Sequence, residues 1–135
     1  MMSSEVDLSG LRLLVVDDEP DTREMLSSAL EAHGAEVVTL ADAEQALHWL
    51  GSSRADLLVS DVAMPRMDGC ALIREIRRRD AGPGAMPAVA VSAFARPEDR
   101  RRALEAGFQD YLTKPVEPEV LVAAVAALVR PRAAA

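Results

Sequence analysis

The chain has 135 residues, of which 50% are hydrophobic and 27% charged. That length suits one ordinary domain, and the apolar share can bury a core, which excludes an intrinsically disordered chain. A net charge of −7 and only four aromatic residues argue against direct nucleic-acid binding, because an acidic surface repels phosphates and single strands need rings to stack on.

Short apolar runs without alternation indicate buried strands. Five of them occur, in chain order at residues 11–16, 37–40, 57–59, 88–91 and 111–112. Each precedes apolar side chains at helical spacing, in the segments 20–30, 46–50, 72–76, 97–106 and 121–129. The fourth helix has the weakest pattern, since Leu104 is its only large apolar residue.

Buried strands that alternate with helices favour a parallel sheet covered on both faces. The fold class that we expect is therefore α/β: a doubly wound, five-stranded parallel sheet with five helices. We take its strand order to be 2-1-3-4-5, the flavodoxin-like order among doubly wound sheets. The chain divides into an N-terminal extension at 1–10, one domain at 11–130 and a C-terminal tail at 131–135.

The composition also predicts a compartment. Cys70 is the only cysteine, which excludes an internal disulfide and a multi-cysteine metal site. No apolar run approaches the roughly 18 residues of a membrane helix. The acidic N-terminus lacks the basic flank of a signal peptide. We expect a soluble, cytoplasmic protein with no membrane partner.

Polar side chains stand where the apolar strands stop. Asp17 and Asp18 follow the first strand and Asp61 the third, while Ser92 and Lys114 close the fourth and fifth. The carboxyl ends of parallel strands meet at one edge, and the order 2-1-3-4-5 makes strands one and three neighbours at the switch point. Three converging carboxylates repel one another unless a divalent cation lies among them, and oxygen ligands suit Mg²⁺. A magnesium site is therefore predicted.

Lys114 stands out by its residue type. It is the only lysine among fifteen cationic side chains, the rest being arginines. A compact ammonium can pair with one carboxylate or one phosphoryl oxygen, which is a reason for the exception. Chance is the alternative reading of a single lysine.

Four motifs together resemble the receiver domain of two-component response regulators, over about residues 11–129. They read VVDDEP from Val15, SDVAMPRMDG from Ser60, VSA from Val91 and GFQDYLTKP from Gly107. The last motif is most similar to receivers attached to hybrid sensor histidine kinases.

The resemblance implies that Asp61 accepts a phosphoryl group from a histidine kinase or a histidine phosphotransfer domain. It implies a Mg²⁺ ion, with Mn²⁺ as a substitute, on Asp17, Asp18, Asp61 and the backbone carbonyl of Ala63. Such a domain is not an enzyme beyond catalysing its own phosphorylation and dephosphorylation. In this family the fourth helix, fifth strand and fifth helix often pair two copies, so a homodimer through that face is a candidate.

The resemblance also assigns the remaining site residues. Ser92 and Lys114 would bind phosphoryl oxygens, and Ser92 and Tyr111 would act as the switch, with the tyrosine turning inward. The peptide bond before Pro115 would be cis. Two further positions flank the phosphoryl group in this family, and here they hold Ala63 and Phe94. Neither side chain can orient a water molecule, so slow self-dephosphorylation is expected.

Other readings stay open. Asp17 and Asp18 alone could simply cap the following helix. A phosphorylation-independent docking module would keep the fold without metal-dependent acyl-phosphate formation. A phosphatase of the aspartyl-nucleophile type places its two acids two residues apart after the first strand, whereas these are adjacent. A flavin-binding protein of this topology is disfavoured, because the acids after strand one would repel its phosphate.

Overall fold

Five parallel strands form one sheet in the order β2-β1-β3-β4-β5. They are β1 (Arg12–Val16), β2 (Glu36–Leu40), β3 (Leu57–Asp61), β4 (Ala88–Ser92) and β5 (Asp110–Thr113). The computed structural model describes residues 6–80, 82 and 84–129. The predicted α/β class, strand order and five helices are confirmed. The tail assigned to 131–135 lies outside the described residues.

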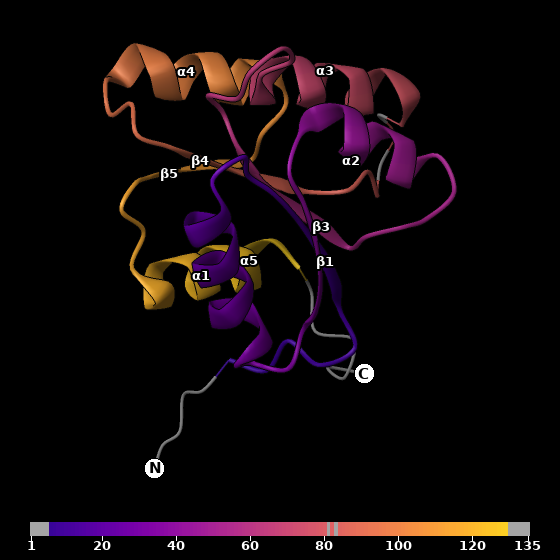
Figure 1. Ribbon diagram of the computed structural model, residues 1–135, viewed down its shortest axis with the longest axis vertical. Helices are drawn as coiled ribbons and strands as arrows, with labels where there is room; N and C mark the ends of the chain where they lie inside the picture. The colour runs from indigo at the N-terminus through magenta and orange to yellow at the C-terminus, as the bar shows by residue number, and fades with distance from the viewer. Residues whose placement is uncertain (1–5, 81, 83, 130–135) are drawn as a thin grey trace.

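Two layers of helices enclose this sheet (Figure 1). The helices are α1 (Pro20–Glu31), α2 (Ala43–Leu50), α3 (Gly69–Arg79), α4 (Pro97–Ala106) and α5 (Pro118–Leu128). Figure 1 shows α1 and α5 on one face of the sheet and α2, α3 and α4 on the other. In the described part of the chain, no helix combines the length and the hydropathy that crossing a bilayer requires.

Both faces of the central strands are apolar because each face packs on a helical layer. Leu13 and Val15 of β1 belong to the cluster formed with α1 and α5. Leu14 and Val16, which point to the opposite face, belong to the cluster formed with α2, α3 and α4. This two-sided burial explains why the strands read as continuous apolar runs rather than as an alternating pattern.

The helices begin at residues suited to a first turn. Proline occupies that position in α1, α4 and α5, where its missing N–H would have no helical partner in any case. The side chains of Asp42 and Asp68 cap α2 and α3 by accepting hydrogen bonds from backbone N–H groups, both at 2.8 Å. These local signals place the start of each helix directly after a strand-end loop.

The packed part of the chain starts before residue 11, where the sequence pattern places the boundary. Leu8 is only 1% exposed and lies in the core cluster on the α1 and α5 side. Its N–H donates to the carbonyl of His33 at 2.7 Å. Leu8 thus belongs to the domain rather than to an extension.

The packing of α4 agrees with its thin apolar pattern, though not through its largest apolar residue. Its buried residues are Ala103 and Ala106, while Leu104 is 36% exposed. Small side chains therefore make the contact of α4 with the core, and the leucine faces outward.

Arg77 connects α3 to the loops that precede β4 and β5. Its Nη1 donates to the carbonyl of Met86 at 2.6 Å, and its Nε and Nη2 donate to the carbonyl of Gly107 at 3.1 and 2.9 Å. Nη2 also donates to Oε1 of Gln109, which accepts a further bond from the N–H of Ala88 at 2.7 Å. Burial lowers the pKa of the Arg77 guanidinium.

We expect Arg77→Lys to lower the free energy of unfolding by about 1–2 kcal/mol, because one ammonium cannot reproduce a planar fork that serves several acceptors. Urea denaturation measures this. The matched control is Arg78→Lys, whose side chain is 75% exposed, with an expected change within about 0.5 kcal/mol. Equal effects of the two substitutions would contradict a structural role for the Arg77 fork.

Candidate functional site

Three aspartates meet at the carboxyl edge of the sheet, where β1 and β3 lie side by side. Val16, the last residue of β1, pairs with Ser60, so Asp17 and Asp61 follow in adjacent positions. Asp17, Asp18 and Asp61 each offer one oxygen within 4.8 Å of the others. Asp17 and Asp61 are buried and Asp18 is exposed. The predicted convergence of the three acids is present.

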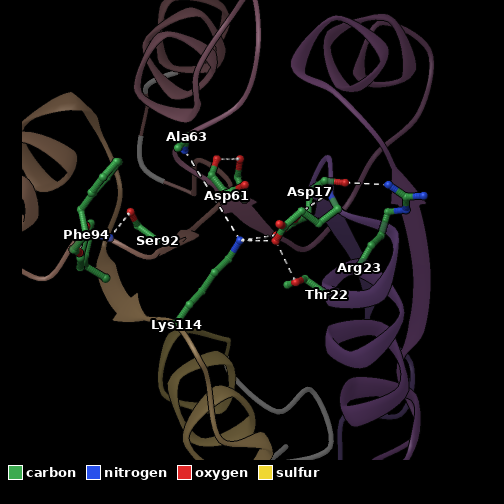
Figure 2. A network of polar contacts seen from close by, with 11 residues as sticks. Asp17, Thr22, Arg23, Asp61, Ala63, Ser92, Phe94 and Lys114 are labelled. Atoms are coloured by element: carbon green, nitrogen blue, oxygen red, sulfur yellow. Dashed lines mark hydrogen bonds and ion pairs between the residues drawn. The ribbon is translucent and has the colours of Figure 1, made fainter.

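Lys114 reaches the same place from the end of β5 (Figure 2). Its Nζ lies 3.2 Å from Oδ2 of Asp17, 3.4 Å from Oδ1 of Asp61 and 3.7 Å from Oε1 of Glu19. The backbone N–H of Lys114 donates to the carbonyl of Ser92 at 2.8 Å, and the peptide bond from Lys114 to Pro115 is cis. Burial lowers the pKa of the Lys114 ammonium, but Asp61 and Asp17 outweigh that effect and raise it above its usual value.

Asp61 has the most altered carboxyl group of the site. Burial raises its pKa, and the adjacent charge of Asp17 raises it further, to about 6, although the Lys114 ammonium opposes the shift. The site therefore holds more negative charge than one ammonium compensates.

Oδ2 of Asp17, which accepts no hydrogen bond, indicates what could supply the missing positive charge. Oδ1 of Asp17 accepts a hydrogen bond from the N–H of Glu19 at 2.9 Å. Oδ2 is buried without a hydrogen bond and has the Lys114 ammonium beside it. A buried carboxylate oxygen normally has its bonding capacity satisfied. Oδ2 of Asp17 and the carboxylates of Asp18 and Asp61 together form a set of oxygen ligands that fits a hard divalent cation such as Mg²⁺.

The loop after Asp61 is held tightly around the site. The N–H of Ala63 donates to Oδ1 of Asp61 at 3.3 Å, and the N–H of Gly69 donates to the carbonyl of Val62 at 2.8 Å. A side chain at Gly69 would overlap the carbonyl oxygen of Asp61. Arg66, at a φ of 69°, forms ion pairs that tie the loop to the start of α2.

Ser92 and Tyr111 converge on the backbone of Phe94, at the start of the loop between β4 and α4. Oγ of Ser92 accepts a hydrogen bond from the Phe94 N–H at 3.1 Å. The Tyr111 hydroxyl donates to the Phe94 carbonyl at 2.6 Å. Both side chains are buried, so the tyrosine ring already lies inward in this structure. Among the described contacts, Tyr111 makes none with the three acids.

Sequence patterns missed the part of the site that comes from α1. Arg23 donates from Nη1 to the carbonyl of Asp17 at 2.7 Å, and the Thr22 hydroxyl donates to Oε1 of Glu19 at 3.2 Å. A signal for Arg23 was available, because it is the only basic residue on a helix that begins beside the acids.

Comparisons of this chain with a family model and with known proteins point to one family. The profile of the response regulator receiver domain matches residues 13–126. An uncharacterized 14.6 kDa protein in the sodA1 3′ region of Leptolyngbya boryana is 50% identical over 115 residues, which cover 85% of this chain and 87% of that protein. The transcriptional regulatory protein PrrA of Mycobacterium tuberculosis is 39% identical over 128 residues, or 95% of this chain and 54% of PrrA.

The structural comparison agrees. The chemotaxis response regulator CheY4 of Vibrio cholerae has a TM-score of 0.81 and 30% identity, with 88% of this chain and 98% of that chain covered. The chain spans about half the length of the transcriptional regulators it matches, PrrA among them. The likeness to PrrA therefore concerns only the part of that regulator which this chain covers.

Proposed function

Because the chain belongs to the response regulator receiver domain family, we propose that it is a phosphoacceptor switch of a two-component phosphorelay. In this proposal a histidine kinase or a histidine phosphotransfer domain donates a phosphoryl group to Asp61. The observation that carries it is the buried Asp61 carboxylate, which shares its site with two further acids and one ammonium. The cytoplasmic location, the attachment to a hybrid kinase and the homodimer stay predictions.

Asp61, Lys114 and Ser92 have separate roles in the proposed phosphoryl transfer. An oxygen of Asp61 attacks the phosphorus in line with the departing imidazole nitrogen, and the product is an aspartyl phosphate. Such a transfer needs alignment and compensation of charge on the equatorial oxygens more than further covalent chemistry. The Lys114 ammonium, 3.4 Å from Asp61, supplies part of that charge. The Ser92 hydroxyl supplies a hydrogen bond once it leaves the Phe94 N–H.

A divalent cation would complete the charge balance. Asp17, Asp18 and Asp61 would hold Mg²⁺, or Mn²⁺ in its place, together with the carbonyl of Ala63. The ion would neutralise charge that builds up on the phosphoryl oxygens. The three acids, and Oδ2 of Asp17, which accepts no hydrogen bond, support this assignment.

The same parts suggest how phosphorylation is read. A phosphoryl group adds roughly −1.5 to −2 charge beside Ser92. Recruitment of the Ser92 hydroxyl would release the Phe94 N–H, while Tyr111 keeps its bond to the Phe94 carbonyl. The loop before α4 would then settle in a second position, which a partner can recognise.

Incubation with a small phosphodonor tests the proposal. We expect the intact mass of the protein to rise by one phosphoryl group with acetyl phosphate and Mg²⁺, and to stay unchanged with a chelator. Asp61→Asn should show no gain in either condition, since an amide cannot form the acyl phosphate. Asp68→Asn, at an exposed helix cap nearby, is the matched control and should react like the wild type. Equal labelling of Asp61→Asn would refute the assignment, and no labelling of any variant would favour the docking module.

The phosphorylated protein is expected to lose its phosphoryl group slowly. Ala63 and Phe94 line a cleft of about 470 Å³ next to the loop that follows Asp61, and neither of these two side chains carries a polar group that could orient a water molecule. Decay followed by mass spectrometry with Mg²⁺ should take minutes or longer. Ala63→Asn should speed it about tenfold, less than the roughly hundredfold given by a well-placed general base. Decay of the wild type within seconds would contradict this prediction.

A further inference from the structure

Arg23 contacts the acidic site through the main chain rather than through a carboxylate. It lies half-buried in the second turn of α1, where its own N–H donates to the carbonyl of Glu19 at 2.9 Å. Its guanidinium reaches back to the end of β1 and donates to the carbonyl of Asp17 at 2.7 Å (Figure 2). That distance is at the short end for a charge-assisted hydrogen bond.

The Arg23 bond completes the fixation of Asp17. The start of α1 already holds the Asp17 side chain, because Oδ1 accepts from the Glu19 N–H. Arg23 holds the carbonyl of the same residue from the next turn. With both groups held, the second carboxylate oxygen stays on the side of the site that faces Lys114 and Asp61.

We propose that Arg23 is a positioning residue for divalent metal binding, acting through the backbone of Asp17. This inference rests on the proposed function, which assigns the metal to the three acids. Groups that orient the ligands of a metal change its affinity by about 10–100-fold when removed. For removal of the Arg23 side chain we expect a loss of metal affinity of about tenfold, the lower end of that range, because Arg23 holds only the main chain of one metal ligand.

The charge of Arg23 predicts the opposite effect. A cation near an acidic site repels a second cation, so its removal would tighten metal binding. In the described part of the chain Arg23 forms no ion pair with a carboxylate, and its guanidinium is engaged with a carbonyl. We expect the loss of positioning to outweigh the relief of repulsion, and the sign of the change in metal affinity separates the two effects.

The test is a Mn²⁺ titration followed by electron paramagnetic resonance of the free ion, which needs no phosphodonor. We expect Arg23→Met to bind Mn²⁺ about tenfold more weakly than the wild type. Arg23→Lys keeps one donor and the charge and should recover part of the affinity. Arg12→Met removes an equal charge from an exposed arginine at the start of β1 and should bind like the wild type.

The Mn²⁺ titration distinguishes failure of the Arg23 inference from failure of the metal assignment. Unchanged or tighter binding by Arg23→Met, with normal binding by the wild type, overturns the inference and leaves the proposed function intact. Failure of the wild type to bind Mn²⁺ overturns the metal assignment and the inference with it. Circular dichroism checks folding, and if Arg23→Met does not fold, Arg23→Lys and Arg23→Gln carry the comparison. Affinity equal to wild type in both overturns the inference, and weakened binding in the folded variants supports it.

Discussion

Replacement of Gly69 by alanine is expected to lower the free energy of unfolding by about 3 kcal/mol, the upper end of typical overpacking costs. A Cβ at this position would overlap the carbonyl oxygen of Asp61 and lie 2.9 Å from Cα of Val62. Both are backbone atoms, so no flexible side chain can move away. The loop must shift instead, and with it the hydrogen bond from the Gly69 N–H to the Val62 carbonyl.

The same shift should slow phosphorylation of Asp61. A misplacement of the reacting group by about 1 Å can cost a hundredfold in rate, and the clash acts on the backbone of the phosphoacceptor itself. Urea denaturation and the rate of labelling by acetyl phosphate measure the two effects. Gly82→Ala is the control, because a Cβ there meets no atom within 4 Å. Wild-type labelling by Gly69→Ala would show that the loop adapts without moving Asp61.

In metal-free protein, Asp61→Asn is expected to be more stable than the wild type by about 2 kcal/mol at pH 8. The pKa of Asp61 rises from 3.8 to about 6, chiefly through burial. A carboxyl with a raised folded-state pKa binds its proton more tightly in the folded chain. The free energy of unfolding of the wild type therefore falls as the pH rises from about 4 to about 6 and stays reduced above that. An asparagine does not ionise and escapes this loss.

Urea denaturation at pH 5 and pH 8 with a chelator checks the sign. The advantage of Asp61→Asn should shrink toward pH 5, and Mg²⁺ should reduce it at pH 8, because the ion stabilises the folded wild type more than the variant. Asp68→Asn keeps a good helix cap at an exposed acid and should show little change. A variant less stable than the wild type at pH 8 would mean that the ion pair with Lys114 outweighs both the burial of the Asp61 carboxylate and the repulsion from Asp17.

The strand ends show where sequence patterns lose accuracy. The apolar runs at 37–40 and 111–112 are shorter than β2 and β5, which begin at the polar residues Glu36 and Asp110. The ladder includes both polar residues, since Glu36 pairs with Arg12 and Asp110 pairs with Val89. Backbone hydrogen bonds do not depend on side-chain polarity, so a pattern of apolar residues underestimates such strands.

Residue patterns alone predicted the fold class and the meeting of the acids. Strands buried on both faces are recognisable as continuous apolar runs, and in a parallel sheet the carboxyl ends of the strands lie at one edge. Three finer contacts became known from the folded structure: the hydrogen bond from Arg23 to the Asp17 carbonyl, the close approach of Gly69 to Asp61, and the hydrogen bond from Tyr111 to Phe94. These depend on side-chain rotamers and on distances between backbones that are remote along the chain. Residue spacing within one element carries no information about either.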